Sequence, residues 1–124
     1  MKILGIDGSG LSASVAILED EKLIAEYTIN NKLTHSQTLM PMINEICQMV
    51  KLDLSTLDAI GVTSGPGSFT GLRISAGTAK GMALGLDIPI VGVPTLDAIA
   101  HNIPYTDYLI CPIMDARRSH LYSA

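Results

Sequence analysis

The chain has 124 residues, 48% of them hydrophobic and 16% charged, which is enough apolar material for one compact domain with its own core. Eight Lys and Arg against twelve Asp and Glu give a net charge of −4. Because the basic residues are also scattered along the chain, direct binding of nucleic acid is disfavoured. No run of uncharged residues is long enough to span a membrane, so we expect no membrane-spanning segment.

Three short apolar segments open the chain, and turns rich in glycine or acidic residues separate them. Met1 and Lys2 lead directly into the first segment without a signal-peptide pattern, so we expect a cytoplasmic location. The alternation predicts an antiparallel meander, followed by a helix that Thr34 and Gln37 begin with a capping box. The predicted strands are 2–6, 12–18, 23–29, 58–64, 88–93, 108–114 and 119–122, and the predicted helices are 34–51, 69–86 and 95–100.

A glycine-rich turn at residues 64–74, Ser-Gly-Pro-Gly-Ser-Phe-Thr-Gly-Leu-Arg-Ile, is the most specific feature of the chain. Ser68 is a suitable helix N-cap, and the free amides of a helix start, with Arg73 one turn later, suit a phosphate or carboxylate. The glycines equally allow a strand and a helix to pack closely, so the loop alone leaves both interpretations open. Its spacing matches neither the P-loop nor the dinucleotide fingerprint.

Two predicted helices have unusual surfaces. The apolar arc of helix 34–51 covers about half of its circumference, wider than the ~100° that one sheet requires. Helix 69–86 carries three glycines four residues apart, each costing about 1 kcal/mol of helix propensity. A small-residue face favours contact with another helix, either the first one or a partner's; close packing on its own sheet is the alternative. The candidate interface residues are His35, Leu39, Met42, Ile46, Met49, Gly77, Lys80 and Gly81.

The order of strands and helices is that of one lobe of the actin-like ATPase superfold. Together with the glycine-rich turn, Thr34-His-Ser-Gln-Thr-Leu-Met-Pro41 and Asp115-Ala-Arg-Arg118 closely resemble the bacterial TsaB (YeaZ) family. The resemblance implies an α/β, ribonuclease H-like (ASKHA) lobe: a mixed sheet with a three-strand antiparallel meander and flanking helices. It also implies that residues 1–103 form this N-terminal lobe and that residues 104–124 begin a second, similar lobe that is truncated here.

The same resemblance implies a non-catalytic scaffold required for threonylcarbamoyladenosine modification of tRNA next to the anticodon. The chain would dimerise with TsaD, the catalytic paralogue; the ATPase TsaE would join the complex, and tRNA would be contacted only indirectly. Left alone, the chain would form a homodimer. Where TsaD has its metal-binding H-x-x-x-H, this chain has Thr95 and Ile99. We therefore expect no metal, no enzymatic activity and no tightly bound cofactor, with ATP or ADP and Mg²⁺ only in the assembled complex.

Asp7 directly follows the first predicted strand, where actin-like ATPases place an acidic residue near the metal and phosphates of the nucleotide. Gly8 stands where the family usually has Thr, which weakens a contact from a hydroxyl to a phosphate. The alternative function is an autonomous ATP-dependent phosphotransferase of the same superfold, and a weaker one is a metallopeptidase. Asp115 and Arg117 are expected to stabilise the turn at the lobe junction. The candidate nucleotide- or anion-binding residues are Asp7, Gly65, Gly67, Ser68 and Arg73.

Overall fold

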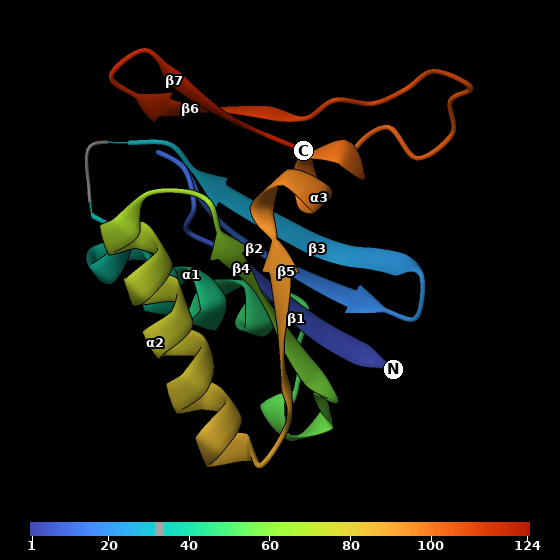
Figure 1. Cartoon of the computed structure of the whole chain (residues 1–124). Coiled ribbons are helices and arrows are strands. Elements are labelled where there is room, and N and C mark those ends of the chain that lie inside the picture. Colours follow the sequence, from blue (N-terminus) through green and yellow to red (C-terminus); the bar gives the residue numbers. More distant parts are fainter. Residues whose placement is uncertain (32–33) are drawn as a thin grey trace.

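The structure, a computed structural model, describes residues 1–31 and 34–124, and its elements follow the predicted order (Figure 1). Helix α2 begins and ends at the predicted residues. The strand predicted from residue 108 begins five residues later, at Ile113, because its partner strand is short and the register ends at the pair Ile113 and Ser123. The strands are β1 (Lys2–Asp7), β2 (Ala13–Glu19), β3 (Lys22–Ile29), β4 (Ala59–Gly65), β5 (Ile90–Pro94), β6 (Ile113–Arg117) and β7 (His120–Ser123). The helices are α1 (His35–Met49), the 3-10 turn η1 (Leu54–Thr56), α2 (Phe69–Leu86) and α3 (Thr95–Ala100).

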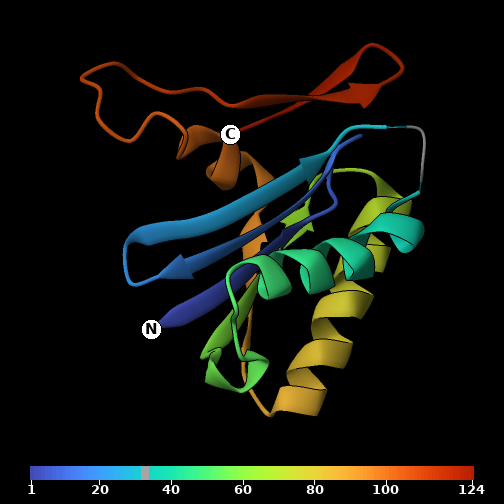
Figure 2. The same cartoon turned by 180° about the vertical axis from the view of Figure 1, so that it is seen from behind.

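Five strands form one mixed sheet in the order β3-β2-β1-β4-β5. The first three strands pair antiparallel through tight turns, as the meander predicts, whereas β4 pairs parallel with both β1 and β5. Parallel neighbours need a crossover connection, and α1 and α2 supply the two crossovers. Both helices lie on the same side of the sheet (Figures 1 and 2).

The hydrophobic core lies between that side of the sheet and the two helices. Alternate residues of the central strands point into it, and one stripe of each helix covers them, as the periods of strand and helix require. The largest side chains with less than 2% exposure are Leu4, Val15, Ile17, Leu39, Met42, Ile43 and Ile60.

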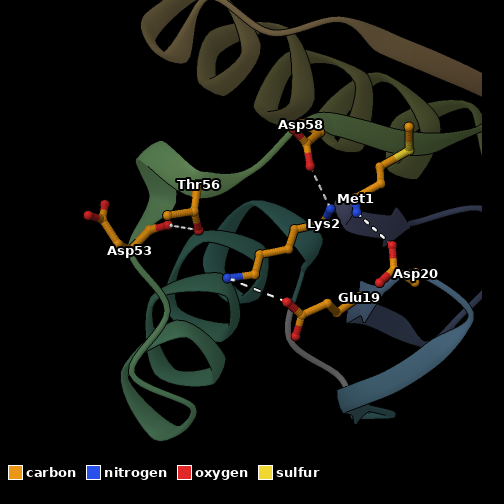
Figure 3. Close-up of polar contacts among 7 residues, drawn as sticks. All are labelled: Met1, Lys2, Glu19, Asp20, Asp53, Thr56 and Asp58. Carbon is orange, nitrogen blue, oxygen red and sulfur yellow. Dashed lines mark hydrogen bonds and ion pairs between the residues drawn. The ribbon is translucent and has the colours of Figure 1, made fainter.

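Backbone and charged contacts tie β1 to its neighbours at the start of the chain (Figure 3). The amide of Lys2 donates to Asp58 Oδ2 at 2.7 Å, and the amide of Asp58 donates back to the Lys2 carbonyl at 2.8 Å. The N-terminal ammonium donates to Asp20 Oδ1 at 2.7 Å, which lowers the pKa of that carboxyl. These contacts hold the β2–β3 turn and the start of β4 beside the first residue.

Strands β6 and β7 form a separate hairpin across the end of the main sheet at which α2 begins (Figure 1). Its turn places Arg117, Arg118 and Ser119 at positive φ, and Asp115 Oδ1 accepts the amide of Arg117 at 2.7 Å. The expected turn role of Asp115 is therefore confirmed, through the backbone of Arg117. The predicted boundary between residues 103 and 104 falls between α3 and this hairpin and stays a prediction. Within the described ranges, no helix is long and apolar enough to cross a membrane.

Candidate functional site

The glycine-rich turn joins the end of β4 to α2, and its local geometry follows the sequence. Ser68 is the N-cap of α2: its Oγ accepts the amide of Gly71 at 3.2 Å. This hydrogen bond satisfies one of the amides that a helix start leaves unpaired. The predicted helix start is confirmed.

The glycines of this turn allow it to touch the backbone of the β1–β2 turn. The amide of Ser68 donates to the Ser9 carbonyl at 2.7 Å, and a Cβ at Gly67 would lie 2.6 Å from that same oxygen. A Cβ at Gly71 would collide with the carbonyl oxygen of Gly8, and a Cβ at Gly8 would lie 2.7 Å from the carbonyl oxygen of Gly71. Close packing is thus the role that the contacts give to these glycines, and it accounts for a glycine at position 8.

Asp7 organises the β1–β2 turn from the end of β1. Its Oδ1 accepts the amide of Ser9 at 2.9 Å, the Ser9 hydroxyl at 2.7 Å and the Thr63 hydroxyl at 2.9 Å. The two bonds to Ser9 form an Asx-type turn, and the third ties β1 to β4. Our sequence reasoning missed both partners. The spacing of an Asp two residues before a Ser predicts the first, whereas no local signal predicts a contact with Thr63.

The surroundings of Asp7 offer little to a phosphate group. The amides of Ser68 and Gly71 already donate to protein acceptors. Arg73 stacks on Phe69, with its guanidinium carbon 5.3 Å from the ring centroid, and both residues lie on the exposed side of α2. These two amides are therefore not free to hold a phosphate as folded. The nucleotide-binding assignment of Asp7, Gly65, Gly67, Ser68 and Arg73 stays a prediction.

His35, the first residue of α1, faces the molecule rather than solvent. Its Nε2 lies 3.0 Å from the Gly10 carbonyl oxygen, and the half-buried ring fills the space beside Gly8 and Gly71. The ring packs where the glycines leave room, and the assignment of His35 to a partner surface stays a prediction. A pocket of about 620 Å³ opens beside it, between the two helix starts and the end of β3.

Three of the predicted interface residues on α1 lie in the core of this chain. Leu39, Met42 and Ile46 are 1–3% exposed, so their assignment to a partner surface is wrong. The wide apolar arc of α1 is explained mostly by contact with both the sheet and α2. Met49, in contrast, is 78% exposed and remains available for contact with a partner.

The small residues of α2 divide between two faces. Ser75, Ala79 and Ala83 are buried against the sheet side. Gly77 and Gly81 are exposed, and a Cβ built on either one meets no atom of residues 1–31 and 34–124 within 4 Å; the same holds for Gly85. The sheet therefore does not explain these glycines. The exposed face of α2, which we call the α2 face, consists of Phe69, Arg73, Gly77, Lys80, Gly81 and Leu84.

Phe69 and Leu84 extend this surface beyond the predicted residues, with 73% and 86% exposure. Their spacing along the helix from Gly77 and Lys80 is a signal that could have found them. The described residues contain no cluster of three or more His, Cys, Asp or Glu side chains placed to hold a metal ion. Cys47 and Cys111 are both free thiols.

The relatives found by comparison with known proteins agree with one another. A family model described as TsaD, tRNA N6-adenosine threonylcarbamoyltransferase, matches residues 22–124. The tRNA threonylcarbamoyladenosine biosynthesis protein TsaB of Bacillus subtilis is 43% identical over 126 residues, covering 99% of this chain and 54% of that protein. The chain thus spans about half the length of this relative.

Two solved structures share the fold. YeaZ from Pseudomonas aeruginosa superposes with a TM-score of 0.77 at 33% identity, covering 83% of this chain and 49% of the other. The crystal structure described as an uncharacterized protein with similarity to peptidase YeaZ from Pseudomonas aeruginosa gives a TM-score of 0.89 at 30% identity, covering 98% and 57% of the two chains. The predicted actin-like, ribonuclease H-like α/β fold, a mixed sheet with flanking helices, is confirmed.

Proposed function

Because the chain belongs to the TsaB (YeaZ) family of tRNA threonylcarbamoyladenosine biosynthesis proteins, we propose that it is a non-catalytic scaffold that dimerises with TsaD. TsaD would carry out the transfer to the adenosine next to the anticodon, and this chain would hold TsaD in its active form. The ATPase TsaE would join the pair, and any ATP or ADP with Mg²⁺ would bind in that assembly.

The α2 face is the observation that carries this proposal. An exposed glycine in a helix interior costs about 1 kcal/mol relative to alanine, and Gly77 and Gly81 receive no packing in return from the residues that the structure describes. A helix without side chains at these positions allows another helix to approach its backbone closely. Phe69 and Leu84, at the two ends of the face, would anchor such a contact.

Charge and a neighbouring helix further define the partner surface. Arg73 and Lys80 lie between the two apolar anchors, so a partner helix with acidic residues opposite them is favoured. Met49 on α1, which packs on the same side of the sheet as α2, adds a flexible apolar side chain. Together these residues fit a contact of helix on helix with a related fold, such as that of TsaD.

The residues of this chain at the positions of the metal pair support the assignment of catalysis to the partner. Thr95 is buried at the start of α3, and Ile99 lies one turn later with 38% exposure. A threonine hydroxyl and an isoleucine side chain do not provide the imidazole nitrogens of an H-x-x-x-H pair.

The partner contact is tested by light scattering on size exclusion, with this chain alone and mixed with TsaD of the same organism. We expect a heterodimer peak that Gly81→Leu abolishes, because leucine closes the approach to the α2 backbone while keeping good helix propensity. Lys80→Glu should weaken the complex, and Lys22→Glu, the same charge change at the distant β2–β3 turn, should not. Two unchanged peaks for the original chain would overturn the proposal for this part of the protein.

The role in tRNA modification requires a separate readout in cells. Threonylcarbamoyladenosine is quantified by mass spectrometry of digested tRNA after depletion of the chromosomal protein and expression of its full-length variants. We expect Gly81→Leu to leave the modified nucleoside depleted and Lys22→Glu to restore it. Full modification with Gly81→Leu would separate the α2 face from the function.

A further inference from the structure

A groove of about 600 Å³ lies between the glycine-rich turn and the hairpin. Phe69 and Thr70 line it from the first turn of α2, and Arg117 and Tyr122 line it from the hairpin. The hairpin crosses the molecule above the start of α2, so the groove is open at the end of the sheet where β1 and β4 finish (Figure 1). Its volume lies in the range of ligand sites.

All three arginines of the chain lie around this groove. Arg117 lines it, Arg118 is the next residue of the hairpin turn, and the guanidinium carbon of Arg73 lies 5.3 Å from the centroid of the Phe69 ring. All three side chains are exposed, and no carboxylate of residues 1–31 and 34–124 lies within ion-pair distance of them. The fold thus gathers basic residues that are far apart in the sequence, and it leaves their charges free for a ligand.

Carboxylates gather instead at the opposite end of the sheet, where β1 begins. Glu19, Asp20, Asp53 and Asp58 lie there, around the first two residues of the chain (Figure 3). Among the described residues that line the groove, Asp115 is the one carboxylate, and its Oδ1 already accepts an amide of the hairpin turn. The net charge of −4 is therefore unevenly distributed, and the groove attracts an anionic ligand.

Aromatic rings and hydroxyl groups narrow the class of anion. Phe69 is 73% exposed and Tyr122 is 43% exposed, and both rings border the groove beside the arginines. Exposed rings stack on unpaired bases, and guanidinium groups bind phosphates through two hydrogen bonds. The hydroxyls of Ser68 and Thr70 line the same groove and suit the 2′-hydroxyl of a ribose. An acidic peptide would satisfy the charges but not the rings.

We infer that this groove binds single-stranded RNA, with phosphates on Arg117 and Arg118 and a base stacked on Tyr122. The ribose lies against the start of α2, where Thr70 donates its hydroxyl. This contact goes beyond the proposed scaffold role, in which tRNA is contacted only indirectly. It uses the hairpin, whereas the proposed partner contact runs along the α2 face; Arg73 borders both surfaces. No covalent step is involved.

The test is fluorescence anisotropy of a labelled ten-nucleotide oligoadenylate RNA titrated with this chain alone, so that the result does not depend on the contact with TsaD. We expect saturable binding with a dissociation constant of about 10 µM at about 50 mM salt. The logarithm of the affinity should fall with the logarithm of the salt concentration with a slope of about 2, since three arginines meet phosphates. Oligodeoxyadenylate and decaglutamate should bind more weakly.

Variants at exposed positions separate the charges from the ring. Arg117→Gln with Arg118→Gln should weaken RNA binding about tenfold and reduce the salt slope to about 0.7. Tyr122→Leu should weaken binding about fivefold without changing the slope. Lys22→Gln with Lys51→Gln removes two charges far from the groove and should change neither quantity. Melting curves of all variants are recorded alongside.

Four results would overturn the inference. The first is no saturable binding of RNA up to about 100 µM of the chain. The second is an unchanged salt slope in the folded double arginine variant, and the third is an equal loss of binding in the double lysine variant. The fourth is equal or tighter binding of oligodeoxyadenylate or decaglutamate.

Discussion

At Gly71 a hydrogen atom in place of a side chain allows the start of α2 to touch the backbone of the β1–β2 turn. Any Cβ there would collide with the Gly8 carbonyl oxygen, and neither backbone segment can move aside without breaking the Ser9 and Ser68 contact. Gly85, at the other end of the same helix, faces open space. The two glycines therefore respond oppositely to the same substitution.

We predict that Gly71→Ala lowers the free energy of unfolding by about 2 kcal/mol or more, as overpacking does. Gly85→Ala should raise it by up to about 1 kcal/mol through helix propensity. Urea unfolding of both variants and of the original chain measures the two changes. Similar changes for the two substitutions would contradict the close approach between the turns.

Cys47 provides a pH-dependent readout of the core. Burial raises the pKa of its thiol above the usual value of 9.0, so the folded state holds the thiol proton more tightly than the unfolded state does. This contribution to stability is complete below the unfolded pKa and is lost as the pH rises through the folded pKa. Cys111 is exposed.

We predict that iodoacetamide at about pH 9 modifies Cys111 quickly and Cys47 only when the chain unfolds. Mass spectrometry after timed quenching resolves the two sites. Cys111→Ser should keep the fall in stability above that pH, since the fall arises at Cys47. Rapid modification of both thiols in the folded chain would contradict the burial of Cys47.

Two of the three methionines of helix α1 lie in opposite environments. Met42 is 1% exposed and packs in the core, whereas Met49 is 78% exposed near the end of the helix. Both belong to the apolar pattern of the helix in the sequence, but only Met42 holds α1 on the sheet. The helix thus contributes to stability through one face, and its last turn presents Met49 to the proposed partner contact.

Met42→Ala should lower the free energy of unfolding by about 2–5 kcal/mol through loss of contacts and a cavity, whereas Met49→Ala should change it by less than about 0.5 kcal/mol. Chemical unfolding measures both. Met49→Ala should instead weaken the complex with TsaD, read as the fraction of heterodimer at a fixed concentration. A large loss of stability with Met49→Ala would place its side chain in the core and remove it from the proposed surface.

The molecule exposes further apolar side chains on the segment that follows α3 and on the hairpin. We call this set the hairpin patch; it consists of Ile103, Tyr105, Tyr108, Leu109, Ile113, Leu121 and Tyr122, which are 43–97% exposed. Exposed apolar surface on this scale favours association.

We predict that the chain alone binds the dye ANS and forms dimers or larger species at micromolar concentration. Leu109→Asp with Tyr105→Asp should reduce both, whereas Leu23→Asp, an exposed leucine at the β2–β3 turn, should not. Light scattering on size exclusion gives the mass, and fluorescence gives the dye binding. Dimers that persist in the double variant but vanish in Gly81→Leu would assign self-association to the α2 face.

Local signals in the sequence determined the elements of this protein. The meander, the capping box and the N-cap at Ser68 depend on residues within a few positions of one another, so the order of the elements along the chain and the bounds of α2 could be predicted. The motifs also identified the family correctly. The sequence indicated that the glycine-rich turn is important. It left open whether the turn binds an anion or allows a strand and a helix to pack closely.

Only the tertiary structure decided how the faces of these elements are used. It placed Gly77 and Gly81 in solvent and Met42 in the core, although both helices carry apolar or small residues over more than one face. His35 meets Gly10 across 25 positions, and Thr63 meets Asp7 across 56. Such contacts depend on how the crossover connections position the strands and helices relative to one another. The short-range patterns of a single sequence do not contain that information.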